Sequence, residues 1–193
     1  MARQKDNPGM VTALALTPSG AITARVECLL LSGRGRLILT GNLKGEAKDS
    51  GQVALSLAIS RAKRLGIDPA EFQRTDVHFH IPGAPTKDGP SAGLAMLVAL
   101  VSAMTRKPVD PGIAFTGELS LSGKILGVGG ISEKVIAALQ GGVTSVYAPT
   151  ESISEMKKLP KKSQKGFKMI PADSIDSVLD LLFGKPKKSP SSR

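Results

Sequence analysis

Residues 91–104 form a run in which almost every side chain is apolar or small, SAGLAMLVALVSAM. A helix over this run is apolar on nearly all its faces, and such a helix is stable only when other elements cover it. Its longest apolar stretch, residues 94–101, is far shorter than the roughly 20 residues that span a membrane. The run therefore predicts a helix at the centre of a globular domain, and the rest of the chain must supply its covering layers.

The rest of the chain alternates between strand and helix patterns. Turn signals such as TPSG at residues 17–20 separate the first strands. Strands are expected at residues 10–16, 22–31, 37–40, 77–81, 113–121, 125–128, 145–148 and near 168–170. Helices are expected at residues 44–65, 91–104, 132–140 and about 174–183, with a small helix between 148 and 168. This alternation predicts an α/β or α+β domain.

The chain has 193 residues and fits one domain, which we place at residues 10–183 after an N-terminal extension at 1–9. Its net charge of +10 favours a nucleic-acid partner. However, ten Lys and Arg residues and only three Asp residues lie between Lys157 and Arg193, so most of the excess charge belongs to the C-terminal end. Aromatic residues make up 3% of the chain, too few for a base-stacking platform. Residues 184–193 are expected to be a basic, disordered tail.

Cysteine and histidine content limits disulfide and metal chemistry. Cys28 is the only cysteine, so no internal disulfide can form. Together with His78 and His80 it is the whole supply of typical zinc ligands, which argues against a structural zinc site. Residues 6–8 interrupt the short basic and apolar start, so a secretion signal is not indicated. We therefore expect a cytoplasmic protein with no metal or cofactor in this chain and no membrane partner.

The most unusual string in the chain is DGPSAG at residues 88–93. Pro90 suits the start of a helix, because its missing N–H is one that a helix start leaves unpaired. Ser91 would then lie among free N–H groups at the positive helix end, as an acyl-transfer nucleophile with an oxyanion hole requires. From the string alone another interpretation is better: Ser91 or Asp88 simply caps a buried helix.

A serine nucleophile needs a base, and the sequence offers three. His78 and His80 lie on one face of an expected strand, where packing or a surface position is the ordinary role. Lys134 lies at the border of the apolar arc of the 132–140 helix. A lysine withdrawn from water loses affinity for its proton and can act as a general base. A lysine with a solvated head group is the more common case, so spacing alone leaves the base open.

The sequence contains no phosphate-binding loop. The nearest string, residues 117–125, has five residues between its glycines and no Ser or Thr after its lysine. The motif requires four residues between the glycines and a Ser or Thr at that place. A turn at Ser122 and Gly123 explains the string better, and the chain has no recognisable ATPase module.

Taken together, four strings resemble the proteolytic domain of Lon proteases. They keep the order of the family's motifs within about residues 9–183. The strings are TDVHFHIP at 75–82, PTKDGPSAG at 85–93, FTGELSL at 115–121 and VGGISEK at 128–134. The KDGPSAG string and the later GGxxEK string carry most of the specificity.

The resemblance implies a mixed α/β (α+β) fold with a buried central helix after the nucleophile loop. It also implies a serine endopeptidase in which Ser91 is the nucleophile and Lys134 the base, a Ser–Lys dyad. Both structural interpretations given above, a capping serine and a solvated lysine, are then reversed. Catalysis would pass through an acyl-enzyme, with backbone N–H groups near Ser91 holding the oxyanion.

The resemblance assigns further residues to supporting roles. Thr116 is implied to position the ammonium of the dyad lysine, and Asp88 to shape the site or its loop switch. His78 and His80 are implied to lie near the site. Leu16 stands where the family often has Trp, a departure that bears on the substrate groove.

The resemblance also implies partners. It predicts polypeptide substrates, a homo-hexameric ring and an ATPase module ahead of this domain, so that ATP and Mg²⁺ belong only to such a module. Without it we expect slow cleavage of short or unfolded polypeptides. Two alternatives stay open: a latent or non-catalytic module that needs assembly or a partner ATPase, and a nucleic-acid-binding module that uses the basic tail.

Overall fold

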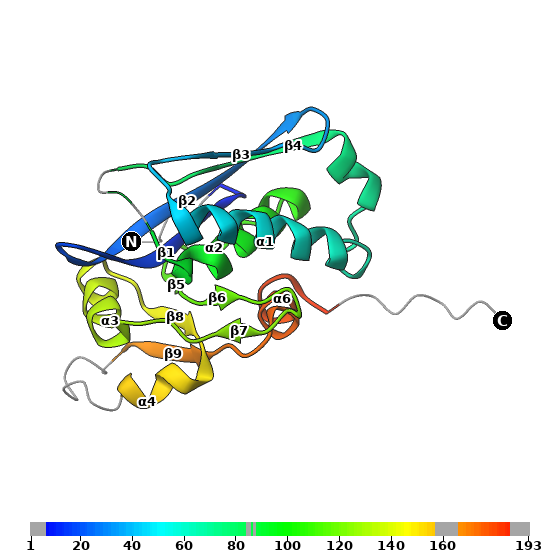
Figure 1. Ribbon diagram of the computed structural model, residues 1–193. Helices are drawn as coiled ribbons and strands as arrows, with labels where there is room; N and C mark the ends of the chain where they lie inside the picture. The colour runs from blue at the N-terminus through cyan, green and yellow to red at the C-terminus, as the bar shows by residue number, and fades with distance from the viewer. Residues whose placement is uncertain (1–6, 84–85, 87, 157–165, 186–193) are drawn as a thin grey trace.

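A mixed sheet of seven strands runs through the computed structural model, which describes residues 7–83, 86, 88–156 and 166–185 (Figure 1). In spatial order its strands are β3 (Leu37–Thr40), β4 (Thr75–His80), β2 (Gly20–Ser32), β1 (Met10–Thr17), β5 (Ile113–Phe115), β8 (Ser145–Ala148) and β9 (Lys168–Pro171). A separate hairpin holds β6 (Glu118–Leu119) and β7 (Ile125–Leu126). The expected mixed α/β class is confirmed.

The sheet has an antiparallel part and a parallel part. β1 and β2 form an antiparallel hairpin paired along the whole of β1, and β2 also pairs antiparallel with β4. β1, β5, β8 and β9 pair in parallel, as do β3 and β4. Parallel neighbours require crossover connections, which the helices provide.

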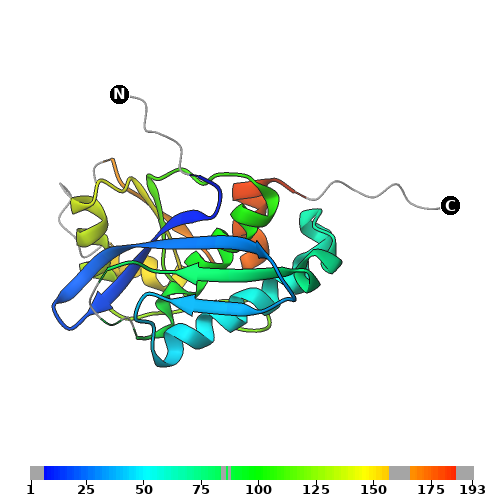
Figure 2. The same cartoon turned by 90° about the horizontal axis from the view of Figure 1, so that it is seen from above.

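Helices cover both faces of the sheet. They are α1 (Gly45–Arg61), α2 (Gly93–Thr105), α3 (Ile131–Gln140), α4 (Ile153–Met156) and α6 (Ile175–Phe183). Ala13 of β1 belongs to the hydrophobic cluster formed with α1, α2 and α6, whereas the next residue, Leu14, belongs to the cluster formed with α3. Because successive strand residues point to opposite faces, these two clusters lie on the two sides of the sheet. Figure 2 shows β1, β2, β4 and β3 side by side.

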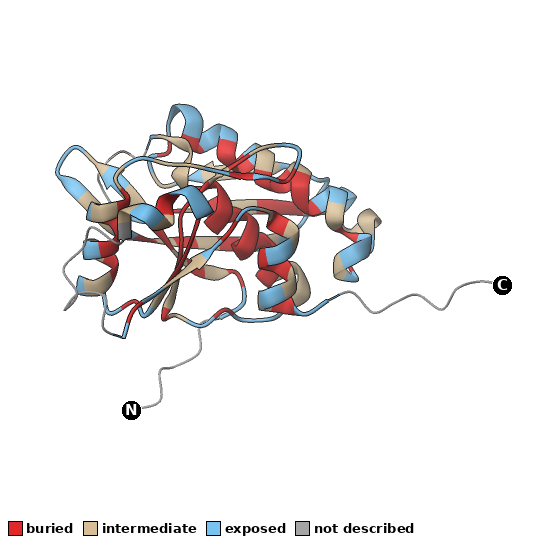
Figure 3. Cartoon of the chain, turned by 90° about the horizontal axis from the view of Figure 1, so that it is seen from below, coloured by how far each residue is buried: buried red, intermediate tan, exposed pale blue. Residues whose placement is uncertain are grey.

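The apolar run around which the sequence analysis was built is α2, and it is central as predicted. Every residue from Gly93 to Ser102 is buried, and the helix appears almost wholly red in Figure 3. The hydroxyl of Ser102 is satisfied inside the protein, since it donates to the Lys107 carbonyl at 2.6 Å and accepts from the Gly9 N–H at 3.0 Å.

The prediction of a single strand at residues 113–121 is wrong, because the structure has two strands there, β5 and β6. The break occurs at Gly117, whose φ is +156°. Its N–H donates to the Ser91 carbonyl at 3.0 Å, and its carbonyl accepts from the Leu94 N–H at 3.2 Å. These bonds turn the chain away from the sheet and tie it to the start of α2, a long-range effect that strand propensity does not contain.

The expected helix at 44–65 is α1 followed by a short 3₁₀ turn, Lys63–Leu65. The helical segment ends at residue 65, as predicted, and Gly66 follows it in a left-handed conformation. A further 3₁₀ helix, Pro69–Gln73, was not predicted, although its signal is present. Asp68 precedes a proline at the first helical position, and its side chain accepts from the Ala70 N–H at 3.0 Å.

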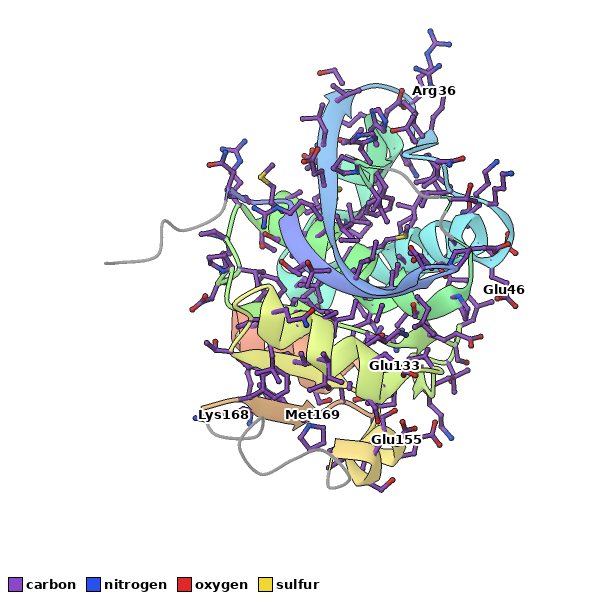
Figure 4. All side chains as sticks on the ribbon, turned by 90° about the vertical axis from the view of Figure 1, so that its left-hand side faces the viewer. Arg36, Glu46, Glu133, Glu155, Lys168 and Met169 are labelled. Carbon is purple, nitrogen blue, oxygen red and sulfur yellow. The ribbon has the colours of Figure 1, made fainter. Side chains whose placement is uncertain are left out.

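A buried carboxylate organises the turn between β2 and β3. Asp76 accepts hydrogen bonds from the N–H groups of Arg34 and Arg36, at 2.8 and 2.9 Å, and pairs with the Arg36 guanidinium. Hydrogen bonding to Arg36 is the main cause that lowers the pKa of Asp76 to about 2. A Cβ at position 33 would lie 2.1 Å from the Asp76 carboxyl carbon, so only a glycine fits there. Arg36 lies at the upper edge of Figure 4.

The described part of the chain contains no helix with both the length and the apolar character needed to cross a membrane. Only Gly184 and Lys185 of the expected tail fall within the described residues, and most of the expected N-terminal extension falls outside them. The disorder expected for the tail therefore stays a prediction.

Candidate active site

Ser91 lies in the 3₁₀ turn Pro90–Ala92, which leads directly into α2. Neither this turn nor α2 is capped by a side chain, so the capping interpretation of Ser91 is wrong. The Ser91 hydroxyl is instead 3.4 Å from the Leu14 carbonyl oxygen. Asp88 does not cap the helix either, because its Oδ1 accepts from the adjacent Gly89 N–H at 2.8 Å.

The backbone around Ser91 is held by Gly117 and stands at the start of a helical run. The Ser91 carbonyl accepts from the Gly117 N–H, as described above. Ser91 and Ala92 lie in the 3₁₀ turn that leads into α2, where the first N–H groups of a helical run point away from the helix and its dipole is positive. N–H groups beside a hydroxyl, at the start of a helix, form an environment that favours a negatively charged oxygen.

Lys134 lies in the first turns of α3, and its side chain is fully buried, with 1% of the residue surface exposed. The interpretation as a lysine with a solvated head group is therefore wrong. Burial, which disfavours the charged form, lowers the pKa of Lys134 from 10.5 to about 8. The neighbouring carboxylate of Glu133, on the exposed side of α3 in Figure 4, opposes this change.

The buried amine of Lys134 is hydrogen-bonded to Thr116. Lys134 Nζ donates to Thr116 Oγ1 at 3.2 Å, and Thr116 Oγ1 in turn lies 3.4 Å from the Leu14 carbonyl oxygen. The same carbonyl is the neighbour of the Ser91 hydroxyl. Leu14 O thus connects the nucleophile candidate to the lysine through Thr116.

The sequence analysis missed Leu14. A backbone carbonyl leaves no mark in the residue type, and its place depends on the parallel pairing of β1 with β5. That pairing joins segments about a hundred residues apart. Thr116, which follows β5 directly, reaches Leu14 because of it.

A cavity of about 280 Å³ opens onto this group. Its lining includes Ser91, Lys134, Asp88 and Leu16, together with the glycine-rich segment 127–129. A larger cavity of about 790 Å³ lies at the other end of α2, and it contains neither Ser91 nor Lys134. The smaller cavity is the candidate site, because it brings a hydroxyl and a perturbed amine together.

The structure does not bring the histidines to this cavity. His78 Nε2 and His80 Nδ1 both bond to the Thr40 hydroxyl, at 2.9 and 2.7 Å. They project from β4, which is separated from β1 by β2. Neither lines the cavity of Ser91 and Lys134. Of the three candidate bases only Lys134 lies at the site.

Asp88 lies between the cavity and the N-terminal end of α1. A Cβ at Gly45 would come within 2.6 Å of Asp88 Oδ1, so the absence of a side chain there allows the close approach.

Across residues 7–83, 86, 88–156 and 166–185, no three or more His, Cys, Asp or Glu side chains gather as they would around a metal ion.

Comparison with known proteins matches this arrangement to one family. Residues 1–185 match the family described as Lon protease (S16) C-terminal proteolytic domain. The chain is 44% identical over 186 residues to a Lon protease of Xanthomonas oryzae pv. oryzae and 40% identical over 186 residues to one of Chloroflexus aggregans. Each comparison covers 96% of this chain.

A Lon protease of Brevibacillus choshinensis is 41% identical over 180 residues, or 93% of this chain. The chain spans only 22–23% of the length of these relatives. The match to the family covers nearly the whole of the chain, including the turn before α2 and the start of α3. The chain therefore belongs to the Lon protease family and corresponds to its C-terminal proteolytic domain.

Proposed function

We propose that this domain hydrolyses peptide bonds, with Ser91 as the nucleophile and Lys134 as the general base. The observation that supports this most is the buried amine of Lys134, with its pKa lowered to about 8, in the cavity that Ser91 also lines. An amine with such a pKa is neutral in a useful fraction of molecules near pH 8, whereas an ordinary lysine is protonated there.

In the first step the Ser91 hydroxyl attacks the carbonyl carbon of the scissile peptide bond. The Ser91 oxygen forms the new C–O bond, neutral Lys134 Nζ takes the hydroxyl proton, and the carbonyl π electrons move to oxygen. The N–H groups of Ser91 and Ala92 donate to this oxyanion. Thr116 accepts a hydrogen bond from the ammonium that results.

In the second step the tetrahedral intermediate collapses. The C–N bond breaks, and the Lys134 ammonium gives its proton to the departing amine. Water then attacks the acyl-enzyme carbonyl and gives a proton to Lys134. The acyl C–Oγ bond breaks, Lys134 returns that proton to Ser91 Oγ, and the substrate leaves with a new carboxyl end. The low pKa of Lys134 suits both directions of this transfer.

The family membership supports a proposal about the substrate and the partners. We propose that unfolded or short polypeptides are the substrates, and that a homo-hexamer is the assembled form. The relatives are four to five times longer than the matched region. ATP and Mg²⁺ enter this proposal only through an attached or partner ATPase module.

The test is hydrolysis of an unstructured casein-like substrate by the full chain, compared with Ser91→Ala and Lys134→Ala. We expect each substitution to reduce turnover by at least about 1,000-fold, because the two groups act as one unit. Activity that survives either substitution would exclude this dyad. Molecular mass measured in the same buffer records whether the active form is an assembly.

One observation favours a second candidate, a domain that is latent until it assembles. The Ser91 hydroxyl lies next to the Leu14 carbonyl, and Lys134 bonds to Thr116, so within the described residues the two dyad groups are not hydrogen-bonded to each other. A monomer that cleaves nothing and gains activity on assembly with further copies or an ATPase would support latency. An active monomer would contradict it.

A further inference from the structure

The turn that carries Ser91 has a second support, on the side opposite Gly117. The segment from Asn42 to Ser50, which enters and begins α1, contacts Thr86, Asp88 and Pro90. Asn42 Nδ2 donates to the Thr86 hydroxyl at 2.9 Å at one end of this contact. At the other end the Ser50 hydroxyl is 3.3 Å from the Pro90 carbonyl oxygen.

The middle of the contact is a close approach between Gly45 and Asp88. Gly45 has a φ of +44°, and a Cβ there would lie 2.6 Å from Asp88 Oδ1. Asn42 is also left-handed, with a φ of +59°. A left-handed residue other than glycine costs free energy, so this path of the chain is held by its tertiary contacts.

Ser50 is a polar residue at a buried position of α1. It is buried, with 6% of its surface exposed, between the apolar neighbours Ala47 and Ala54 of α1. Its hydroxyl lies 2.9 Å from the Glu46 carbonyl as well as 3.3 Å from Pro90 O. One hydroxyl hydrogen is shared between these two acceptors, so each bond is weaker than an undivided one.

A contact to the Pro90 carbonyl affects the turn that carries Ser91. This carbonyl also accepts the N–H of Gly93, the bond that closes the 3₁₀ turn around Ser91. A hydroxyl that fixes this oxygen therefore fixes the turn, and with it the direction of the Ser91 side chain. Displacement of a reacting group by about 1 Å can reduce a rate 100-fold.

We propose that Ser50 is a positioning residue, which holds the Pro90 carbonyl and so sets the place of the Ser91 hydroxyl in the cavity. The inference rests on the proposed function in so far as the Ser91 hydroxyl is the nucleophile. The placement of the turn can be measured without any catalysis.

Ser56 offers a matched control on the same helix. Its hydroxyl donates to the Gln52 carbonyl at 2.9 Å, the same bond one turn back that Ser50 makes to Glu46. Within the described part of the chain, its hydroxyl makes no hydrogen bond to the turn of Ser91. Ser50→Ala and Ser56→Ala thus remove the same helix-internal bond, and only the first removes the bond to Pro90.

Two readouts separate positioning from stability. The first is the rate at which a small fluorophosphonate labels Ser91, measured in a series of buffers up to pH 9. In this reaction Oγ forms a bond to phosphorus, its proton passes to Lys134, and the P–F bond breaks to release fluoride. The second is amide hydrogen exchange of Gly93 and Leu94, followed by NMR. We expect Ser50→Ala to lower the labelling rate about tenfold and to speed exchange at these amides, with the midpoint of labelling against pH staying near 8. Ser56→Ala is expected to stay within twofold of the parent chain in both.

Equal behaviour of the two variants, in either readout, would overturn the inference. So would faster exchange in Ser50→Ala with unchanged labelling, because Ser50 would then support the fold without placing the nucleophile. If Ser50→Ala fails to fold, Ser50→Cys keeps a side chain of similar shape with a weaker donor, and the same comparisons apply. If the parent chain is not labelled at all, the proposed peptidase activity fails, and exchange at Gly93 and Leu94 alone decides whether Ser50 holds the turn.

Discussion

Lys134 is the residue in which burial has the clearest chemical consequence. In water its amine would hold a proton at any physiological pH. In this fold the amine donates to Thr116, and 1% of the surface of Lys134 is exposed to solvent. The same burial that produces a usable base also removes the charged form from water, so the chemistry and the stability of the protein are linked through one side chain.

The first prediction concerns the pH dependence of catalysis. Because only neutral Lys134 can accept the Ser91 proton, we expect kcat/KM to rise with pH through a midpoint near 8 and then to level off. The measurement is peptide hydrolysis in a series of buffers of constant ionic strength. A midpoint near 6.5 would point to a histidine, and one above 10 to a solvent-exposed lysine.

The second prediction concerns stability. The folded pKa of Lys134 is lower than the unfolded value, so at pH 7 the fold bears the cost of a buried ammonium. We expect Lys134→Met to raise the free energy of unfolding at pH 7 by about 1 to 3 kcal/mol while abolishing activity. Urea denaturation at several pH values checks this. The parent chain should recover the difference as pH rises from 8 to 10.5, and a gap that does not shrink would contradict this cause.

At the scale of elements, the connection between β5 and β6 decides where the proposed catalytic groups lie. At Gly117 the chain leaves the sheet and is hydrogen-bonded to the start of α2. Thr116, just before it, accepts a hydrogen bond from Lys134. Gly117 has a φ of +156°, and a Cβ would lie 2.6 Å from Ile125 Cγ2. A side chain at this position would strain the backbone and would push against Ile125 of β7.

The third prediction follows from this connection. Gly117→Ala is expected to lower the free energy of unfolding by roughly 2 kcal/mol and to reduce labelling of Ser91. Gly129→Ala is the control for stability, because a Cβ there meets nothing within 4 Å. It should change the free energy of unfolding by less than about 0.5 kcal/mol. Equal stability losses in the two variants would show that Gly117 is not special.

The elements also show how far the sequence could be interpreted. Long patterned segments such as α2 and the β1–β2 hairpin could be predicted, because their signals are local: an apolar run, alternation and turn residues. The break at Gly117 could not, because it depends on a hydrogen bond to Ser91 that is distant in sequence. The same holds for the site. Ser91 and Lys134 could be nominated through a family resemblance, whereas Leu14 O depends on the pairing of β1 with β5.

At the scale of the whole molecule, stability against acid depends on a different buried group. Asp76 has a pKa lowered to about 2, chiefly by Arg36. Its folded value lies below the unfolded value of 3.8, so its contribution is fully present above about pH 4. That contribution is lost as pH falls from about 4 to 2. The two buried charges thus act at opposite ends of the pH range, Asp76 in acid and Lys134 in base.

The fourth prediction tests the acid end. We expect Asp76→Asn to lower the urea midpoint at pH 7 and to flatten the fall in stability between pH 4 and 2, because the titrating carboxylate is gone. Denaturation curves at pH 7, 4 and 3 measure both effects. Asp110→Asn serves as a comparison, since Asp110 is exposed and its carboxylate accepts a hydrogen bond from the Gly112 N–H. The same flattening in Asp110→Asn would contradict the assignment to Asp76.

The two groups of the proposed dyad come from opposite sides of the sheet. Ser91 precedes α2, which packs in one hydrophobic cluster, and Lys134 belongs to α3, which packs in the other. An unfolded chain has neither cluster, so its lysine keeps an ordinary pKa of about 10.5 and stays protonated. If Lys134 is the base as proposed, that base forms only when the second cluster has closed, and the unfolded chain is expected to cleave nothing.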